Sequence, residues 1–313
     1  MALQALGATL IVGGLVLPVV RRRLRLSPLT VLAGSALAPI SAAVVWPRPR
    51  GRVVAVCALQ MYVYLAAYKM PHDDPAALEA RVRIDYPVAL DRAIGLGQLP
   101  TTRLQRSLHA DGSFSGLERV LVWAHWVWFA TPHAALAYVG ARNPSRFVRA
   151  AGLTYAVFDL GVIAYWLVPT APPWYAAEHD RLGPLEAGET SRVRRLMVEY
   201  GESFWGERWD SLYSVLGGNP LAAMPSLHFA TSSMAALLLG ETGFLPGVLG
   251  TSYATVLGFA LVYLGEHYVV DLAGGLALCV LVRAGEPLVR RPFARGRALV
   301  AGLRQLALDP GSV

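Results

Sequence analysis

The sequence predicts an all-α polytopic membrane protein, a bundle of about six to eight transmembrane helices. Of its 313 residues, 55% are hydrophobic and 16% charged, and the mean hydropathy is +0.43. A soluble domain carries about 25% charged residues. The charges also gather between long apolar runs, which is typical of chains that cross a membrane several times.

Eight segments are apolar over nearly the ~20 residues that a spanning helix needs. The first, residues 3–20, is followed rather than preceded by the basic cluster Arg21 to Arg25, which predicts a retained helix and not a cleaved signal peptide. Several of the eight are short or contain Gly or Pro, so we expect kinked or partly spanning helices. The other seven are 29–46, 52–68, 119–139, 149–168, 225–240, 246–264 and 268–284.

Two polar stretches, 69–118 and 170–219, interrupt the apolar segments and fall on the same side of the membrane if all eight segments span. No repeat or linker divides the chain, so we expect a single membrane domain. Its expected parts are N-terminal helices with a polar segment (1–118), a helical catalytic core (119–284) and a basic C-terminal tail (285–313).

The basic residues indicate membrane orientation rather than nucleic-acid binding. Lys and Arg number 28 against 21 Asp and Glu, but the arginines lie beside apolar segments and not on one patch. The arginine-rich tail favours a cytoplasmic C-terminus, although Arg21 to Arg25 point the other way. We expect a plasma-membrane protein whose two polar stretches lie on the extracytoplasmic face.

The residues best suited to catalysis lie at the beginning of two of the last three apolar segments. Ser226 and His228 belong to the run Met224-Pro225-Ser226-Leu227-His228, and His267 and Asp271 precede the last segment. His267 follows His228 by 39 residues, which is one helix down and one back at about 1.5 Å per residue. The two imidazoles therefore return to the same depth.

Asp271 follows His267 by four residues, so in a continuing helix the carboxylate can hold one imidazole nitrogen. That contact fixes the tautomer and leaves the other nitrogen as a nucleophile. His228 can then protonate a departing oxygen. Ser226 can cap its helix, whose first-turn amides favour an anion such as phosphate.

Other interpretations of these residues stay open. Each residue can be a packing residue or a cap, and the trio of histidines and aspartate can hold zinc, with weak support from the spacing. The trio can also line the ion path of a transporter, although such a path places ionisable groups near the midplane. A serine hydrolase using Ser226 and His267 would lack the usual glycine-flanked elbow.

The two motifs resemble the second and third signatures, Pro-Ser-x-His and His-x-x-x-Asp, of the type 2 phosphatidic acid phosphatase superfamily, over roughly residues 150–284. The resemblance implies that family's helical core and an enzyme that needs neither metal nor cofactor. His267 would attack phosphorus to give a phosphohistidine, Asp271 would orient it, and His228 would protonate the leaving alkoxide. The partners would be a phospholipid or polyprenyl phosphate and, in a transferase, an alcohol acceptor.

The chain departs from this superfamily in its phosphate-binding cations. The first signature, Lys followed by Arg-Pro, is not present as such, and Leu261 stands where an arginine usually lies six residues before the nucleophile. Because a phosphoryl group needs positive charge around it, we expect Lys69 and Arg83 to supply that charge. Ser226 would join them in binding the substrate.

Further runs are similar to one branch, the inositol phosphorylceramide synthases. They are Ala171-Pro172-Pro173-Trp174-Tyr175, the Met224-to-His228 run, and Tyr263-Leu264 before His267-Tyr268-x-x-Asp271-Leu272. This resemblance implies transfer of an inositol-phosphate or similar headgroup between lipids. The alternative is a simple phosphatase of lipid phosphates or polyprenyl (di)phosphates.

Two further groups are interpreted as structural. His125 lies among Trp123, Trp126 and Trp128, and an aromatic-rich helix near the membrane surface is more often an anchor than a pocket. Arg192, Arg194 and Arg195 form a charge run, which is usually a solvated face.

Overall fold

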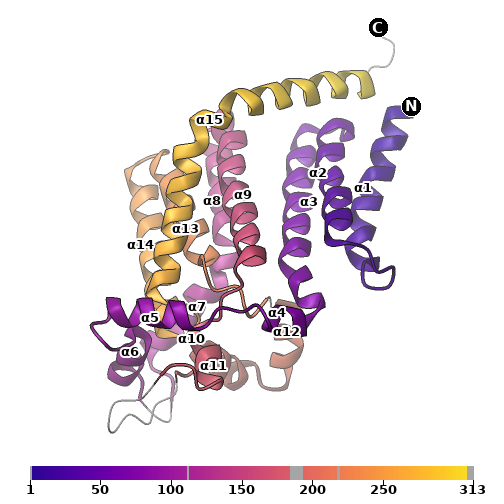
Figure 1. The fold of residues 1–313 in the computed structure, drawn as a ribbon. Helices are drawn as coiled ribbons and strands as arrows, with labels where there is room; N and C mark the ends of the chain where they lie inside the picture. The colour runs from indigo at the N-terminus through magenta and orange to yellow at the C-terminus, as the bar shows by residue number, and fades with distance from the viewer. Residues whose placement is uncertain (1, 111–112, 184–192, 217–218, 309–313) are drawn as a thin grey trace. The chain divides into compact units, whose positions relative to one another are not determined.

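A computed structural model describes residues 2–110, 113–183, 193–216 and 219–308. These residues form helices joined by turns (Figure 1), and the only β-pairing among them is two isolated bridges, Arg83 with Thr170 and Thr170 with Ala222. The predicted all-α class is confirmed.

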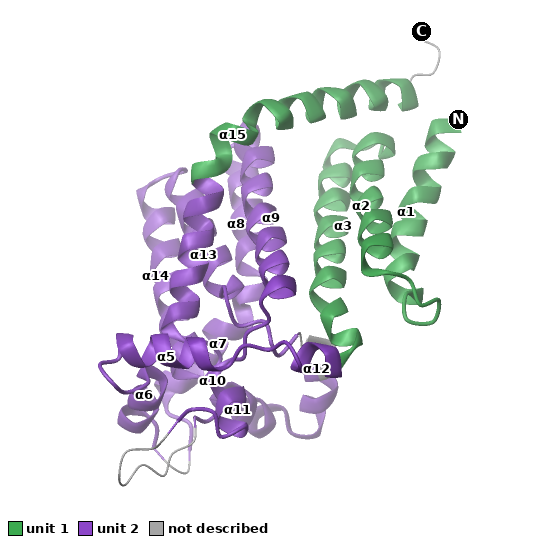
Figure 2. Ribbon diagram, in the orientation of Figure 1, with its two compact units in different colours: residues 1–75, 284–313 green, residues 76–283 purple. Residues whose placement is uncertain are grey.

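The chain divides into two compact units (Figure 2), residues 1–75 with 284–313 and residues 76–283. The single membrane domain with internal boundaries at 118 and 284 stays a prediction. All residues of the candidate site except Lys69 belong to the second unit.

The first unit is built on three consecutive apolar helices, α1 (Ala2–Val20), α2 (Pro28–Val45) and α3 (Pro49–Lys69), followed by the 3-10 turn η1 (Met70–Asp73). Ser27 caps α2 by accepting a hydrogen bond from the Thr30 N–H at 3.2 Å. Arg21 pairs with Asp73 at 2.6 Å, which ties the end of α1 to the end of α3.

The second unit places short helices around a set of longer ones. Helices α13 and α14 pack against each other, and α8 and α9 pack against α13. In chain order its helices are α4 (Pro75–Glu79), α5 (Asp85–Ile94), α6 (Pro100–Leu108), α7 (Gly116–Trp126), η2 (Val127–Phe129), α8 (Thr131–Arg142), α9 (Pro144–Leu167), α10 (Pro173–Glu178), α11 (Leu196–Trp205), η3 (Gly206–Arg208), α12 (Trp209–Leu216), α13 (Leu227–Gly240), α14 (Phe244–Tyr263) and the part of α15 (Val269–Leu308) that precedes Ala284.

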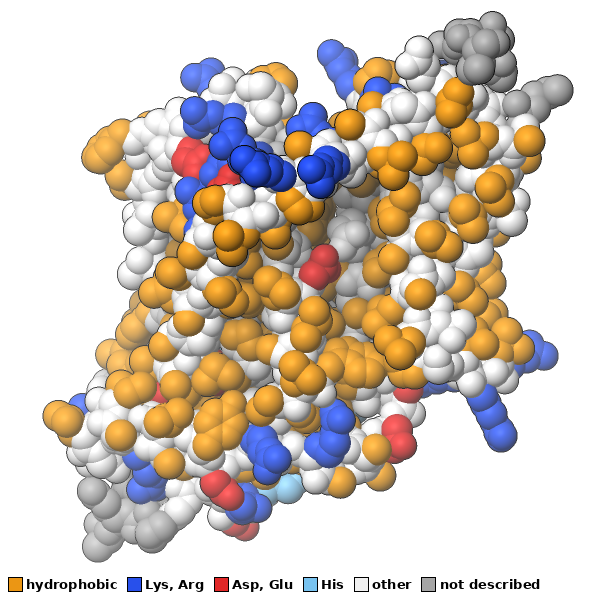
Figure 3. Space-filling view, turned by 45° about the horizontal axis from the view of Figure 1, so that its top comes forward, with side chains coloured by type: hydrophobic (Ala, Val, Ile, Leu, Met, Phe, Trp, Pro, Cys, Tyr) orange, Lys and Arg blue, Asp and Glu red, His pale blue; other side chains and the backbone are white. Residues whose placement is uncertain are grey.

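Six helices of the described residues are long and apolar enough to cross a membrane, within the predicted six to eight. On the face drawn in Figure 3, hydrophobic side chains cover most of the surface and Lys and Arg gather toward its upper and lower parts. The six are Ala2–Val20, Pro28–Val45, Pro49–Asp73, Pro144–Leu167, Phe244–Tyr263 and Val269–Leu308.

Two of the eight predicted segments differ from a single spanning helix. The segment 119–139 is broken into α7 and α8 by η2, and Pro132 in the first turn of α8 suits a helix start because it lacks an N–H. The segment 225–240 gives the 14-residue α13, which is shorter than a full span. The basic tail from 285 onward continues α15 to Leu308.

Apart from residues 69–75, which belong to the first unit, the described parts of the two polar stretches belong to the second unit and pack together. Val88 and Leu99 from the first stretch pack with Ala176 and Val193 from the second and with Tyr268. Tyr268 directly follows His267 in the chain. The polar stretches therefore pack against the turn that carries His267.

Candidate functional site

The helix pair α13 and α14 brings the two histidines together. Ser226 caps α13 by accepting a hydrogen bond from the Phe229 N–H at 3.3 Å, and His228 is the second residue of that helix. Helix α14 returns and ends at Tyr263, and residues 264–268, here called the catalytic turn, lead into α15. His267 lies in this turn.

His228, His267 and Asp271 form a continuous line of contacts, here called the catalytic chain after the role that the sequence predicts for it. Asp271 Oδ2 lies 3.2 Å from His267 Nδ1, and His267 Nε2 lies 3.2 Å from His228 Nδ1. Asp271 is fully buried and His267 is 4% exposed. Because Asp271 accepts the Nδ1–H proton, His267 Nε2 is left with a lone pair toward His228.

The four-residue spacing allows a contact between His267 and Asp271 within one continuous helix. The two side chains do make contact, but no continuous helix joins them. Helix α15 begins only at Val269, and Gly265 in the turn has a φ of +82°, which a residue with a Cβ rarely adopts. Asp271 lies in the first turn of α15, and its Oδ2 also accepts the Tyr268 N–H at 2.9 Å. The carboxylate thus holds the catalytic turn and His267 with the same oxygen.

The beginnings of α13 and α15 are bonded to each other, which fixes the depth of the two histidines. The Ser226 N–H donates to the Asp271 carbonyl at 2.9 Å. A Cβ at Gly275 would lie 2.6 Å from the Ser226 carbonyl oxygen, so only a glycine permits this close approach. Tyr165 of α9 donates its hydroxyl proton to the Pro225 carbonyl at 2.8 Å.

The His228 ring is held by aromatic rings from the broken segment α7–η2. Its centroid lies 4.1 Å from that of Trp128 and 5.0 Å from that of His125, whose plane is inclined by only 27°. Trp128 in turn donates its Nε1–H to the Thr231 hydroxyl at 2.9 Å. His125 and Trp128, interpreted from the sequence as parts of an anchor, therefore touch the candidate acid.

Arg83 lies beside backbone that is bonded to the loop before His228. Its N–H donates to the Pro169 carbonyl at 2.8 Å, and its carbonyl accepts the Ala171 N–H at 3.0 Å. Between them, the Thr170 carbonyl accepts the Ala223 N–H at 3.1 Å, in the loop before α13. The Arg83 side chain is exposed, and its contact with phosphate stays a prediction.

The other predicted binding residues are placed differently. The Ser226 side chain is fully buried and occupied by its capping bond, so its observed role is to start α13. Lys69 is the last residue of α3 in the first unit. Leu261, at the position of the missing arginine, is fully buried. Substrate binding by Ser226 and Lys69 stays a prediction.

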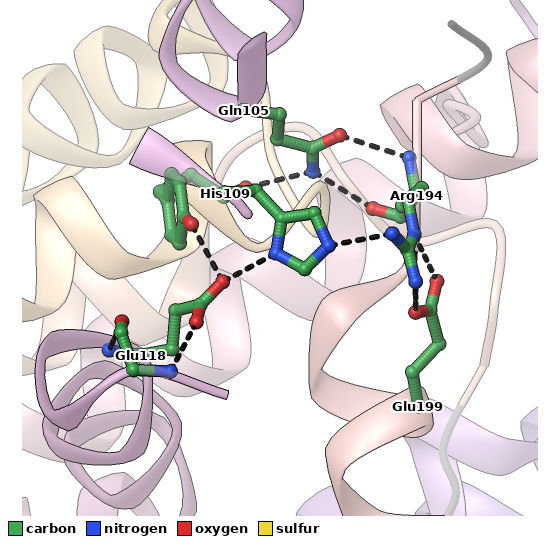
Figure 4. Close-up of polar contacts among 7 residues, drawn as sticks. Gln105, His109, Glu118, Arg194 and Glu199 are labelled. Carbon is green, nitrogen blue, oxygen red and sulfur yellow. Dashed lines mark hydrogen bonds and ion pairs between the residues drawn. The ribbon is translucent and has the colours of Figure 1, made fainter. Parts of the chain in front are cut away.

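A buried ionic network fixes the end of α14 just before the catalytic turn (Figure 4). Glu118, 1% exposed, accepts the Tyr263 hydroxyl proton at 2.8 Å and lies 2.5 Å from His109 Nδ1. Arg194 donates to His109 Nε2 at 2.5 Å and also pairs with Glu199. We call Glu118, His109, Arg194, Glu199 and Tyr263 the Glu118 network.

Gln105 joins the same two segments through three bonds (Figure 4). Its Nε2 donates to the carbonyls of Arg194 and Tyr263, both at 2.8 Å, and its Oε1 accepts the Arg194 N–H at 2.9 Å. The Arg194 side chain is exposed, as the interpretation of a solvated face expects, while its backbone is bonded to Gln105. Arg192 lies outside the described residues.

Arg195 pairs with Glu266, the residue directly before His267. Its Nε donates to Glu266 Oε1 at 2.9 Å, and its guanidinium lies 4.0 Å from the ring centroid of Trp174. Burial opposes the positive charge of Arg195, but the Glu266 carboxylate outweighs this effect and raises the pKa of Arg195. Arg195, interpreted from the sequence as part of a solvated face, is therefore a permanent cation close to the catalytic turn.

Asp91 of α5 was not selected from the sequence, yet it binds the start of α15. It is fully buried, and its Oδ1 accepts the Val270 N–H at 2.9 Å. Burial raises the pKa of Asp91 to about 6. The nearby charge of Asp271 also raises this pKa, whereas the hydrogen bond from Val270 lowers it. A carboxylate at a helix N-terminus is favourable, but no local spacing links residue 91 with residue 270.

The comparisons with known proteins agree with this arrangement. The model of the PAP2 superfamily matches residues 88–284. Inositol phosphorylceramide synthase of Candida albicans is 27% identical over 177 residues, covering 54% of this chain and 36% of that protein. Phosphoinositol dihydroceramide synthase of Bacteroides thetaiotaomicron is 29% identical over 126 residues, 39% of each chain. The chain thus spans well under half the length of these curated relatives, and no solved structure matches it.

Proposed function

Because the chain belongs to the PAP2 superfamily, we propose that this integral membrane protein is an enzyme that transfers a phosphoryl group from a lipid phosphoester through a phosphohistidine on His267. The observation that carries the proposal is the catalytic chain, in which a buried carboxylate, an imidazole and a second imidazole follow one another at 3.2 Å. This order provides an orienting group, a nucleophile and a proton donor.

In the first step, the His267 Nε2 lone pair attacks phosphorus and the bond from phosphorus to the lipid oxygen breaks. His228 gives its proton to that departing oxygen, so a neutral alcohol leaves. Asp271 keeps the Nδ1 proton of His267 in place and offsets the positive charge that forms on the phosphorylated ring. In the resting structure His228 Nδ1 faces Nε2 at 3.2 Å, so an incoming phosphorus must displace His228 from this contact.

In the second step, an acceptor hydroxyl loses its proton to His228 and its oxygen attacks phosphorus. The bond between phosphorus and Nε2 breaks, and His267 and His228 return to their starting states. The steps consume no oxidant and use no metal. Exclusion of water from the site decides the acceptor, because water and an alcohol compete for the same intermediate.

We propose an alcohol as the acceptor and an inositol-phosphate or similar headgroup as the transferred group. This choice follows the two relatives, an inositol phosphorylceramide synthase and a phosphoinositol dihydroceramide synthase. In this case the substituent on phosphorus stays attached through both steps. Hydrolysis of lipid phosphates or polyprenyl (di)phosphates is the second candidate, since it differs only in its acceptor.

The membrane side and the phosphate-binding cations belong to the same proposal. We propose that the site faces the extracytoplasmic side of the plasma membrane, because the arginine-rich tail favours a cytoplasmic C-terminus. Arg83 and Lys69 remain the proposed cations, and Ser226, whose hydroxyl is occupied by its capping bond, remains a proposed substrate-binding residue through its place at the start of α13.

The test is an assay of purified protein in detergent micelles against phospholipids and polyprenyl phosphates. Free phosphate and new lipid products are followed by mass, with His267→Ala and His228→Ala as inactive variants and the exposed His72→Ala as the matched control. A new phospholipid that His267→Ala cannot make would support transfer, and free phosphate that depends on His267 would support hydrolysis. Turnover that survives in His267→Ala would contradict the phosphohistidine mechanism, and silence with every lipid would contradict the proposal and favour the transporter interpretation.

A further inference from the structure

His125 occupies a place in the site that neither signature motif covers. It lies near the end of α7, and its ring is stacked on His228 with centroids 5.0 Å apart. The His228 ring is in turn 5.3 Å from the His267 ring, measured between centroids. The His125 imidazole therefore lies directly beside the candidate acid, which itself contacts the nucleophile.

The two nitrogens of His125 have different surroundings. Nδ1 is buried and has no hydrogen-bond partner among the described residues, whereas the side chain as a whole is partly exposed. A proton on Nδ1 would be a buried donor without an acceptor, which is unfavourable. Buried unpaired N–H groups are rarer than buried unpaired acceptors. The proton of the neutral ring therefore resides on Nε2, and only Nε2 can meet a ligand.

The proposed phosphoryl transfer requires a hydrogen-bond donor near the phosphoryl oxygens, and His125 can supply one. Leu261 replaces the arginine that the family usually has near the phosphate, and its side chain is fully buried and apolar. Charge that builds on the phosphoryl oxygens still requires fixed hydrogen-bond donors in a site shielded from water. Arg195 is engaged by Glu266 and Trp174, so an additional donor is needed.

We propose that His125 is a third imidazole of the active site, whose Nε2–H donates a hydrogen bond to a non-bridging oxygen of the transferring phosphoryl group. This inference rests on the proposed function. His125 makes no bond to phosphorus and gives up no proton; it binds the substrate and lowers the energy of the transition state. The ligand chemistry is that of a phosphate ester or diester.

Two substitutions separate hydrogen bonding from ring stacking. His125→Phe keeps a ring against His228 but removes Nε2–H, and His125→Gln removes the ring but places an amide N–H near the position of Nε2. Trp123→Phe, an exposed neighbour on the same helix, is the control. We expect kcat/KM to fall about 100-fold in His125→Phe and to stay within about tenfold of the unmodified enzyme in His125→Gln. Equal activity of His125→Phe and the unmodified enzyme would overturn the proposal.

Calorimetric titration with orthovanadate, an analogue of the transferring phosphoryl group, gives a readout that needs no turnover. We expect the unmodified protein to bind vanadate, His125→Phe to bind it at least tenfold more weakly, and His125→Gln to retain most of the affinity. Absence of vanadate binding by the unmodified protein, or equal binding by His125→Phe, would contradict the role of His125. Lipid turnover that needs His267 but not His125 would reject this inference while leaving the proposed function intact.

Discussion

The Glu118 network and the catalytic chain both hold an imidazole against a buried carboxylate, but they differ at the far nitrogen of the histidine. In the network, His109 Nε2 accepts from Arg194, which cannot give up its proton. In the catalytic chain, His267 Nε2 meets His228, which can both give and take a proton. Under the proposed function, the third partner of the histidine therefore decides whether a carboxylate and histidine pair is reactive or structural.

The largest contrast is expected when a carboxylate is replaced by its amide in each region. In Asp271→Asn, the Tyr268 N–H still holds an oxygen toward His267, so the tautomer is kept and only the negative charge is lost. We expect kcat to fall about 10²- to 10⁴-fold with little change in Tm. In Glu118→Gln, one donor of the network loses its acceptor, and we expect a loss of about 2 kcal/mol of stability with kcat within about tenfold.

Both variants are measured in the same micelles by steady-state kinetics and by thermal unfolding. A loss of activity in Glu118→Gln as large as that in Asp271→Asn would break the comparison, because the network would then take part in the reaction. Nearly full activity in Asp271→Asn would remove Asp271 from the catalytic chain.

A smaller effect is expected at Gly265, where the two regions meet. Its φ is +82°, and a Cβ there would lie 2.6 Å from the Arg194 carbonyl oxygen. Gly265→Ala should therefore cost about 1–3 kcal/mol and lower kcat by displacing His267. The control Gly302→Ala lies within α15 with no atom near its Cβ and should be neutral or stabilising by up to ~1 kcal/mol. Equal Tm values for the two variants would show that the turn is not constrained as described.

The smallest effect concerns Asp91 and depends on pH. Its pKa of about 6 in the folded protein exceeds the ~3.9 of an unfolded aspartate. The folded state thus holds this proton more tightly, and the contribution of Asp91 to stability is lost as the pH rises through about 6. Asp91→Asn cannot ionise, and its amide oxygen can still accept the Val270 N–H. We expect its Tm relative to the unmodified protein to rise between pH 5 and pH 8.

Thermal unfolding at several pH values measures this difference. A constant Tm difference across the range would mean that the Asp91 carboxylate does not change its protonation there. A large loss of stability in Asp91→Asn at pH 8 would mean that its negative charge at the start of α15 outweighs the cost of burial.

Local spacing in the sequence was enough to predict the catalytic chain. His228 and His267 are separated by one helix pair, and His267 and Asp271 by four residues, so few alternatives existed for their arrangement. The continuing helix that this spacing allows is not formed, because the chain turns at Gly265 and α15 begins only at Val269.

The rest of the site depends on contacts between segments that are distant in sequence. Asp91 reaches Val270 across 179 residues, and Arg195 reaches Glu266 across 71. Neither pair belongs to a helix period or a local motif, so packing of the polar stretches had to be known first. The sequence shows that His125 lies among tryptophans. Its contact with His228, however, depends on the break of the segment into α7 and α8.

The central claim is tested most directly by looking for the phosphohistidine itself. The purified enzyme is mixed with a lipid substrate labelled on phosphorus, quenched in alkali, in which phosphohistidine is stable, and digested for mass analysis. We expect the label on the peptide that contains His267, no label in His267→Gln, and a longer-lived label in the absence of an acceptor. Turnover by His267→Gln, or label on another residue, would contradict the account.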